Sequence, residues 1–257
     1  MKIEQCTAMI TGAASGIGET TTRQMVKAGA RVAMLDLNAE RGERIAAELG
    51  DAAIFCQTDV SSESDMEKTV AKVKETLGTV HIVVNCAGIG GSVKIVGRDG
   101  VMPMEAFNSR VQVNLVGTFT VIRAAAPMMM ENEPNEEGER GVIINTASIA
   151  AFDGQIGQSA YASTKGGIVS MTLPLTREFA RNGIRVMAIL PGIVNTPLLA
   201  KNPPEVLDNL AKQVPFPPRL GKPEEFASLA CHIVENTYLN GESIRLDGGL
   251  RMGFGRK

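Results

Sequence analysis

Aromatic and metal-binding side chains are scarce in this chain. Among 257 residues there is no Trp, and there are two Tyr, two His and four Cys. His81 and His232 have no partner at ligand spacing, so we expect no metal site and no Cys-His nucleophile pair. The cysteines, none of them in a CxxC pair, are Cys6, Cys56, Cys86 and Cys231. This usage is typical of buried thiols in a reducing compartment, and it predicts a cytoplasmic protein.

Charge of one sign and long apolar runs are also lacking. The formal net charge is −2, with 44% hydrophobic and 21% charged residues. We therefore expect a soluble globular protein with no nucleic-acid or membrane partner, and no segment long enough to span a bilayer. The first strand is predicted to start near Cys6, with Met1–Gln5 before it, so no signal or transit peptide is expected.

Short apolar runs alternate with longer amphipathic stretches along the whole chain. The predicted strands are Thr7–Ile10, Arg31–Asp36, Ala52–Gln57, Val80–Asn85, Gly141–Thr146, Arg185–Leu190 and Ser243–Leu246. The predicted helices are Gly16–Ala28, Ala39–Leu49, Glu63–Leu77, Met104–Met130, Ala160–Arg181 and Pro223–Val234. This order predicts an α/β fold, with a Rossmann-type doubly wound parallel sheet of about seven strands and helices on both faces.

Two segments interrupt the alternation without dividing the chain. Residues 90–103 are rich in Gly, and residues 191–223 hold eight of the twelve prolines. Both follow the carboxyl ends of predicted strands, where ligands bind in open α/β sheets. We therefore predict a single domain over residues 1–257, with substrate loops at 90–103 and 191–223.

A glycine-rich turn joins the first strand to the first helix. Gly12, Gly16 and Gly18 allow a tight turn and close backbone approach, and the helix N-terminus offers N–H groups to a pyrophosphate. The spacing is G-x-x-x-G-x-G rather than the usual G-x-G-x-x-G, so a plain strand-to-helix turn is the alternative.

Asp36 ends the second strand, eighteen residues after Gly18. A carboxylate there can accept hydrogen bonds from both adenosine ribose hydroxyls and would repel a 2′-phosphate. Since no Arg or Lys immediately follows Asp36 and position 15 is Ser, the pattern predicts NAD rather than NADP as cofactor. Asp59 could contact the adenine or cap a turn, and Asn85 could lie against the cofactor or pin neighbouring strands.

Tyr161 and Lys165 stand four residues apart, which places both on one face of a helix. An ammonium about 4 Å away stabilises a phenolate by about 4 kcal/mol at a dielectric constant of about 20. This corresponds to about three pKa units, enough to make the phenol a proton relay near neutral pH. Ser148 follows the fifth strand, where it could join this pair or cap a turn.

Together these motifs resemble the short-chain dehydrogenase/reductase family from Thr11 to Asp247. The residues that carry the resemblance are Gly12, Gly16, Gly18, Asn85-Cys-Ala-Gly88, Asn114, Ser148, Tyr161, Lys165 and Pro191-Gly192. Cys86 departs from the family, which often has a second Asn there. The resemblance implies NAD-dependent hydride transfer between the nicotinamide and a secondary alcohol or ketone.

The resemblance also implies the site residues. Tyr161 would exchange a proton with the substrate oxygen, Lys165 would lower the pKa of Tyr161, and Ser148 would hold the same oxygen. Asn114 would hold a water that links Lys165 to solvent. The implied cofactor contacts are Gly12, Ser15, Gly16, Ile17, Gly18, Asp36, Asp59, Val60, Asn85, Ala87, Gly88, Tyr161, Lys165, Pro191, Gly192, Ile193 and Thr196.

Residues 132–148, 154–158, 213–217 and 244–249 resemble a subgroup of this family that converts 3-hydroxyacyl-CoA to 3-oxoacyl-CoA with NAD and forms homotetramers. The expected substrate is therefore an acyl-CoA or another hydrophobic secondary alcohol or ketone. Alternatives are a hydroxysteroid or other secondary-alcohol dehydrogenase, a 3-oxoacyl-carrier-protein reductase that uses NADPH, and last a non-catalytic NAD-binding scaffold. We expect the acidic loop 131–140 to be solvated; alternatively, it packs between subunits.

Overall fold

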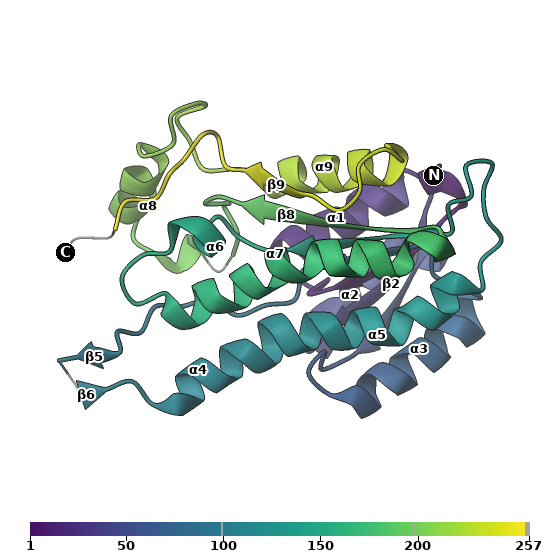
Figure 1. The fold of residues 1–257 in the computed structure, drawn as a ribbon, viewed down its shortest axis with the longest axis horizontal. Helices are drawn as coiled ribbons and strands as arrows, with labels where there is room; N and C mark the ends of the chain where they lie inside the picture. Colours follow the sequence, from purple (N-terminus) through teal and green to yellow (C-terminus); the bar gives the residue numbers. More distant parts are fainter. Residues whose placement is uncertain (99, 198, 255–257) are drawn as a thin grey trace.

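A parallel sheet of seven strands forms the centre of the protein in a computed structural model that describes residues 1–98, 100–197 and 199–254. The strand order is β3-β2-β1-β4-β7-β8-β9 (Figure 1). The strands are β1 (Thr7–Thr11), β2 (Arg31–Asp36), β3 (Ala53–Gln57), β4 (Ile82–Asn85), β7 (Gly141–Thr146), β8 (Ile184–Pro191) and β9 (Ser243–Leu246). The predicted doubly wound α/β fold is thereby confirmed.

Helices cover both faces of this sheet. The main helices are α1 (Gly16–Lys27), α2 (Ala39–Leu49), α3 (Glu63–Leu77), α5 (Gly117–Met130), α7 (Ser159–Phe179) and α9 (Pro223–Glu235). Met25 of α1, Ile45 of α2 and Phe226 of α9 belong to one apolar cluster. Val73 of α3 and Ile122 of α5 belong to a second cluster, on the opposite face. Burial on both faces explains why the strands are continuously apolar rather than alternating.

The strand order reverses between β1 and β4. From β1 the chain continues to β2 on one side of the sheet, whereas from β4 it continues to β7 on the other side. These two strands pair in parallel register, with Thr11 opposite Asn85. The chain therefore leaves their carboxyl ends in opposite directions and opens a crevice at this edge. Such a switch point is the usual ligand site of an open α/β sheet.

The predicted helix Met104–Met130 is helical throughout but is not a uniform α-helix. It consists of α4 (Met104–Arg110), a π-helical turn over Val111–Val116, and α5. By length and composition this run could cross a membrane, which corrects the expectation that no segment is long enough. Of its most apolar window, 56% is buried inside the protein, and a core helix of a soluble protein passes the same test.

Both segments predicted as substrate loops contain some regular structure. Segment 90–103 carries the hairpin β5 (Val96–Gly97) and β6 (Gly100–Val101), and segment 191–223 carries α8 (Pro204–Ala211). Asp99 and Leu198, one in each segment, lie outside the described residues. These elements are too short to leave a periodic pattern, so the sequence did not indicate them.

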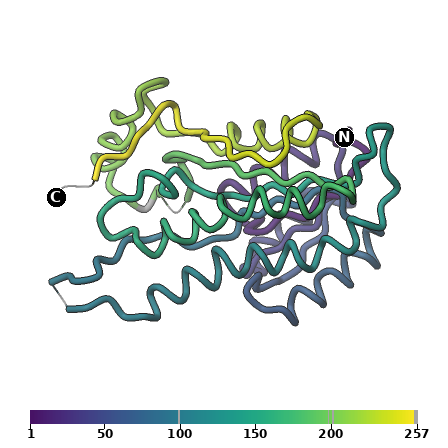
Figure 2. Tube along the Cα trace, viewed as in Figure 1, coloured from purple at the N-terminus to yellow at the C-terminus, as the bar shows by residue number. Residues whose placement is uncertain are grey.

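The acidic loop 131–140 is not wholly solvated, contrary to the first interpretation of its sequence. Glu139 is buried, and its carboxylate lies 2.7 Å from Arg185 Nη2 and 3.1 Å from the Met1 amino group. The loop and Met1 therefore meet at one end of the molecule, while β5 and β6 project at the other (Figures 1 and 2). A buried carboxylate needs such partners, because an unpaired one is costly.

A candidate active site at the carboxyl edge of the sheet

The glycine-rich turn after β1 has little space for side chains. Gly12 and Gly16 have φ angles of 63° and 52°, a region that favours glycine. A Cβ on Gly18 would lie 2.2 Å from the Gly12 carbonyl oxygen, so no side chain fits there. The turn therefore presents bare backbone and the N-terminus of α1 to the crevice, as a pyrophosphate site requires.

Asp36 is tied to this turn through its carboxylate. The Ala14 N–H donates to Oδ2 at 3.0 Å, and the Asn38 N–H donates to Oδ1 at 2.9 Å. Both oxygens keep further acceptor capacity, because a carboxylate offers about four lone-pair directions. The end of β2 and the glycine-rich turn thus form one rigid corner with a negative charge at its edge.

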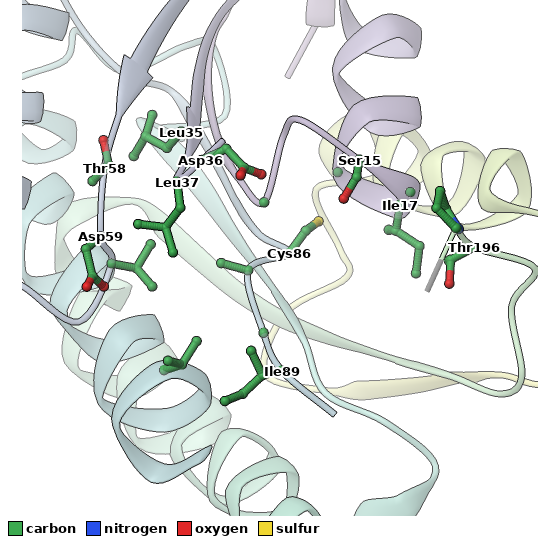
Figure 3. Close-up of a pocket in the computed structure, with 18 residues that line it drawn as sticks. Ser15, Ile17, Leu35, Asp36, Leu37, Thr58, Asp59, Cys86, Ile89 and Thr196 are labelled. Carbon is green, nitrogen blue, oxygen red and sulfur yellow. The ribbon is translucent and has the colours of Figure 1, made fainter. Parts of the chain in front are cut away.

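A cavity of about 400 Å³ opens beside this corner (Figure 3). Eleven predicted cofactor residues line it: Gly12, Ser15, Gly16, Ile17, Gly18, Asp36, Asp59, Val60, Ala87, Gly88 and Thr196. Seven others were not predicted: Leu35, Leu37, Thr58, Cys86, Ile89, Val113 and Pro197. Most of these flank a predicted residue in the sequence. Val113 flanks Asn114, which was predicted as a site residue but not as a cofactor contact, and it comes from the π-helical turn.

The remaining predicted cofactor residues do not line this cavity. Asn85 is buried, and its Nδ2 donates to Asn145 Oδ1 at 2.9 Å, which favours the strand-pinning interpretation. Pro191 ends β8, and Gly192 and Ile193 follow it; a Cβ on Gly192 would lie 2.8 Å from the Asp247 Cβ. Tyr161 and Lys165 also lie outside the lining and belong to α7.

The first turns of α7 bring Tyr161 and Lys165 to the end of β7. Lys165 is 4% exposed, and its ammonium donates to the Thr146 carbonyl oxygen at 2.6 Å. The same ammonium lies 5.8 Å from the centroid of the Tyr161 ring. Ser148 follows β7, and its hydroxyl is hydrogen-bonded to the Tyr161 phenol. Ser148, Tyr161 and Lys165 thus meet at the carboxyl end of β7, although they are thirteen and four positions apart in the sequence.

The ionisation of this pair differs from the sequence-based prediction. Burial raises the pKa of Tyr161 above its ordinary value, and the hydrogen bond with Ser148 acts in the opposite direction. Burial also lowers the pKa of Lys165 to about 8. The net shift of the phenol pKa is therefore upward, opposite to the direction predicted from the spacing of Tyr161 and Lys165. The physical reason is that removal from water disfavours both charged forms.

Asn114 lies in the π-helical turn and is fully buried. Its Oδ1 accepts the Ile89 N–H at 2.8 Å, and its Nδ2 donates to the Ile89 carbonyl at 2.9 Å and to Thr164 Oγ1 at 3.2 Å. A Cβ on Gly88 would lie within 3.2 Å of Asn114 Oδ1 and 3.7 Å of Lys165 Nζ. Asn114 therefore links the segment after β4 to α7, next to Lys165.

Cys86, the departure from the family pattern, points into the crevice as a protonated thiol. Thr146 Oγ1 donates to its sulfur at 3.7 Å, and burial raises the pKa of the thiol to about 12. A thiol with so high a pKa is a poor nucleophile. Cys86 therefore contributes packing to this site rather than covalent chemistry.

Comparison with known proteins identifies the family. The pattern of the short chain dehydrogenase family matches residues 6–206. The chain is 51% identical to human 3-hydroxyacyl-CoA dehydrogenase type-2, over 95% of each chain. The crystal structure of 3-hydroxyacyl-CoA dehydrogenase type-2 from Mycobacterium avium superposes with a TM-score of 0.94 at 39% identity, covering 99% of this chain and 100% of that one.

A second solved structure shows a related protein with a dinucleotide. The 3-ketoacyl-(acyl-carrier-protein) reductase from Brucella melitensis, complexed with NADH, superposes with a TM-score of 0.88 at 34% identity, covering 97% of this chain and 100% of that one. The glycine-rich corner and its cavity fit such a ligand. The chain belongs to the short-chain dehydrogenase family, whose members are oxidoreductases that act on CH–OH groups with a nicotinamide cofactor.

Proposed function

We propose that this protein is an NAD-dependent dehydrogenase that interconverts 3-hydroxyacyl-CoA and 3-oxoacyl-CoA. The observation that carries the proposal is the convergence of Ser148, Tyr161 and Lys165 at the sheet edge that also holds the dinucleotide cavity. A binding scaffold would not require this convergence, which is why we rank that alternative last.

Each of the converging side chains has a proposed role. Tyr161 exchanges a proton with the substrate oxygen, and Ser148, already bonded to the phenol, holds the same oxygen in place. Lys165 binds the nicotinamide ribose and stabilises the phenolate, and Asn114 positions a water beside Lys165. When bound, the nicotinamide supplies or accepts the hydride.

The corner around Asp36 supports NAD as the cofactor. Its carboxylate lines the cavity and has capacity to accept hydrogen bonds from ribose hydroxyls. Thr196 lines the same cavity, and we propose that it holds the carboxamide together with the Ile193 backbone. Neither Ser15 nor Leu37, which also line this part of the cavity, carries the positive charge that a 2′-phosphate requires.

Apolar surface near Tyr161 supports a long acyl substrate. A second cavity, of about 410 Å³, lies between residues 94–96 of the first substrate loop and residues 154–159, which lead into the first turn of α7. Ile95, Val96 and Ile156 are exposed beside it. Sterols or simpler secondary alcohols would also fit such a surface, so they remain alternative substrates. The likeness to the Brucella reductase favours a carrier-protein thioester as the second candidate.

We further propose that residues 1–257 act as one catalytic domain, with substrate loops at 90–103 and 191–223, and that four copies assemble. Exposed apolar side chains on the run that contains α5, at Val116 and Phe119, and on α7 at Leu173 support assembly. Residence in the cytoplasm stays a prediction from cysteine usage.

The decisive experiment measures NADH oxidation with acetoacetyl-CoA. Tyr161→Phe removes the proton donor and keeps the ring, so turnover should fall at least about 100-fold. The NADH dissociation constant should stay within about twofold, because the dinucleotide cavity is unchanged. Tyr238→Phe is the matched control, since Tyr238 is 99% exposed, and it should retain full activity. Equal activity of Tyr161→Phe and the wild type would falsify the assignment of roles.

A further inference from the structure

A salt bridge between α1 and α2 joins two segments that each follow residues of the dinucleotide cavity lining. Glu19 directly follows Gly18 of the cavity lining, and Arg41 lies in the first turn of α2. Arg41 Nη2 donates to Glu19 Oε2 at 3.1 Å. The pair therefore connects the glycine-rich turn to the segment that follows β2.

Arg41 is also linked to Asp36 through the backbone. Asp36 Oδ1 accepts the Asn38 N–H at 2.9 Å, and Asn38 Oδ1 accepts the Arg41 N–H at 3.0 Å. Two consecutive hydrogen bonds thus separate the backbone of Arg41 from the carboxylate proposed to bind the adenosine ribose. The Arg41 side chain is long enough to reach from the first turn of α2 to the Asp36 carboxylate.

The guanidinium of Arg41 has donor capacity that is not used. Within the described part of the chain, its Nε is buried and has no hydrogen-bond partner. A guanidinium presents its donors in a planar fork that matches phosphate oxygens. If Glu19 released it, Arg41 could therefore bind a 2′-phosphate on the adenosine ribose.

A purely structural role explains the Glu19–Arg41 pair less well. The two side chains are 36% and 21% exposed, for Arg41 and Glu19 respectively, and pairs of this exposure contribute little to stability. Glu19 is also shared with Arg23, whose Nη2 lies 2.7 Å from Glu48. Without Glu19, the ion pair of Arg23 and Glu48 would still connect α1 and α2, whereas Arg41 would lose its carboxylate partner.

We propose that Glu19 is a second specificity-determining residue for the cofactor, an inference that rests on the proposed use of this cavity for NAD. Asp36 repels a 2′-phosphate directly. Glu19 holds the Arg41 guanidinium in a salt bridge, so that the guanidinium is not free to bind the phosphate. Glu19 also adds a negative charge next to the cavity lining. Selection of NAD over NADP is therefore divided between two carboxylates on different elements.

The test measures binding of NADH and NADPH by fluorescence titration, with no substrate present. Asp36→Asn serves as background, because it removes the charge and keeps a carbonyl oxygen for a backbone N–H. Adding Glu19→Gln should tighten NADPH binding about tenfold, the size of one charge-assisted contact. NADH binding should stay within about twofold, because NADH has no 2′-phosphate. Adding Arg41→Leu as well should abolish the gain.

Glu48→Gln in the same background is the matched control. It changes the charge of the same network by the same amount, but Glu48 binds Arg23 and not Arg41. It should leave NADPH binding within about twofold. An equal gain with Glu48→Gln, a gain that persists with Arg41→Leu, or no gain with Glu19→Gln would each overturn the inference.

The single variant Glu19→Gln, which keeps Asp36, supplies a second route in case the combined variants do not fold. It should bind 2′-phospho-ADP-ribose about threefold more tightly than the wild type and ADP-ribose equally well. If the wild type binds NADH and these ratios do not move, this inference fails and the proposed function stands. If the wild type binds no NADH, the proposed function fails as well.

Discussion

At the scale of single residues, burial controls the ionisation of the catalytic pair. Spacing alone predicts an ammonium beside a phenol, and the 5.8 Å between Lys165 Nζ and the Tyr161 ring is consistent with that picture. However, desolvation is the largest cause of the shift in the pKa of both groups. A Coulomb estimate from spacing omits this cost, which depends on every atom packed around the pair.

The pH dependence of reduction should report the Lys165 ammonium. The pKa of Lys165 lies at about 8, so the group loses its positive charge as the pH rises through that value. Reduction also consumes the Tyr161 proton, so loss of that proton at high pH lowers the rate of reduction as well. The kcat/KM for acetoacetyl-CoA should fall above about pH 8, and Lys165→Met should remove this limb and lower the rate.

The control for this profile is Lys68→Met, at a side chain that is 80% exposed. It should reproduce the wild-type curve. A wild-type profile that stays flat from about pH 7 to about pH 9.5 would show that the charge of Lys165 does not govern the rate.

At the scale of elements, the π-helical turn Val111–Val116 shapes the site more than any regular helix. An inserted residue in a helix locally widens the turn, and such turns are frequent at functional sites. This turn presents Asn114 to Ile89 and Thr164, and Val113 to the cavity. Sequence analysis placed Asn114 inside the predicted helix Met104–Met130, but the altered hydrogen-bond pattern depends on what the turn packs against.

Asn114→Ala should cost stability as well as activity. It leaves the buried Ile89 N–H without its acceptor, which costs about 1–3 kcal/mol. Denaturant unfolding should show this loss, and turnover should drop because Asn114 lies beside Lys165. Gln112→Ala, in the same turn but exposed, should stay within about 0.5 kcal/mol of the wild type and keep its activity. Equal effects of the two changes would contradict the proposed position of Asn114.

At the scale of the whole molecule, apolar surface remains after the sheet is covered on both faces. Phe119 of α5 is 49% exposed and Leu173 of α7 is 44% exposed, on neighbouring helices of the same side (Figure 1). Exposed apolar side chains clustered on packed helices are typical of subunit interfaces. They are the structural support for the proposed tetramer.

Light scattering should therefore give about four times the chain mass of 27.3 kDa, close to 109 kDa. Phe119→Glu would place a carboxylate in the proposed interface and should lower that mass to a dimer or monomer. Lys68→Glu on α3 also introduces a carboxylate, but on a solvated face, and should leave the mass unchanged. A wild-type mass of one chain would rule out the tetramer.

The sequence by itself determined the fold class, the family, and the identity of the converging side chains. These follow from periodicity and from local spacing, such as the glycine-rich turn and the Tyr161–Lys165 step, which are short-range properties of the chain. Only the tertiary structure decided that Asn85 is hydrogen-bonded to Asn145 and that Glu139 is buried against Arg185. It also decided that burial is the largest influence on the pKa of Tyr161. These outcomes depend on contacts between residues 46 to 60 positions apart, or on the summed environment of a group. Neither can be read from local patterns.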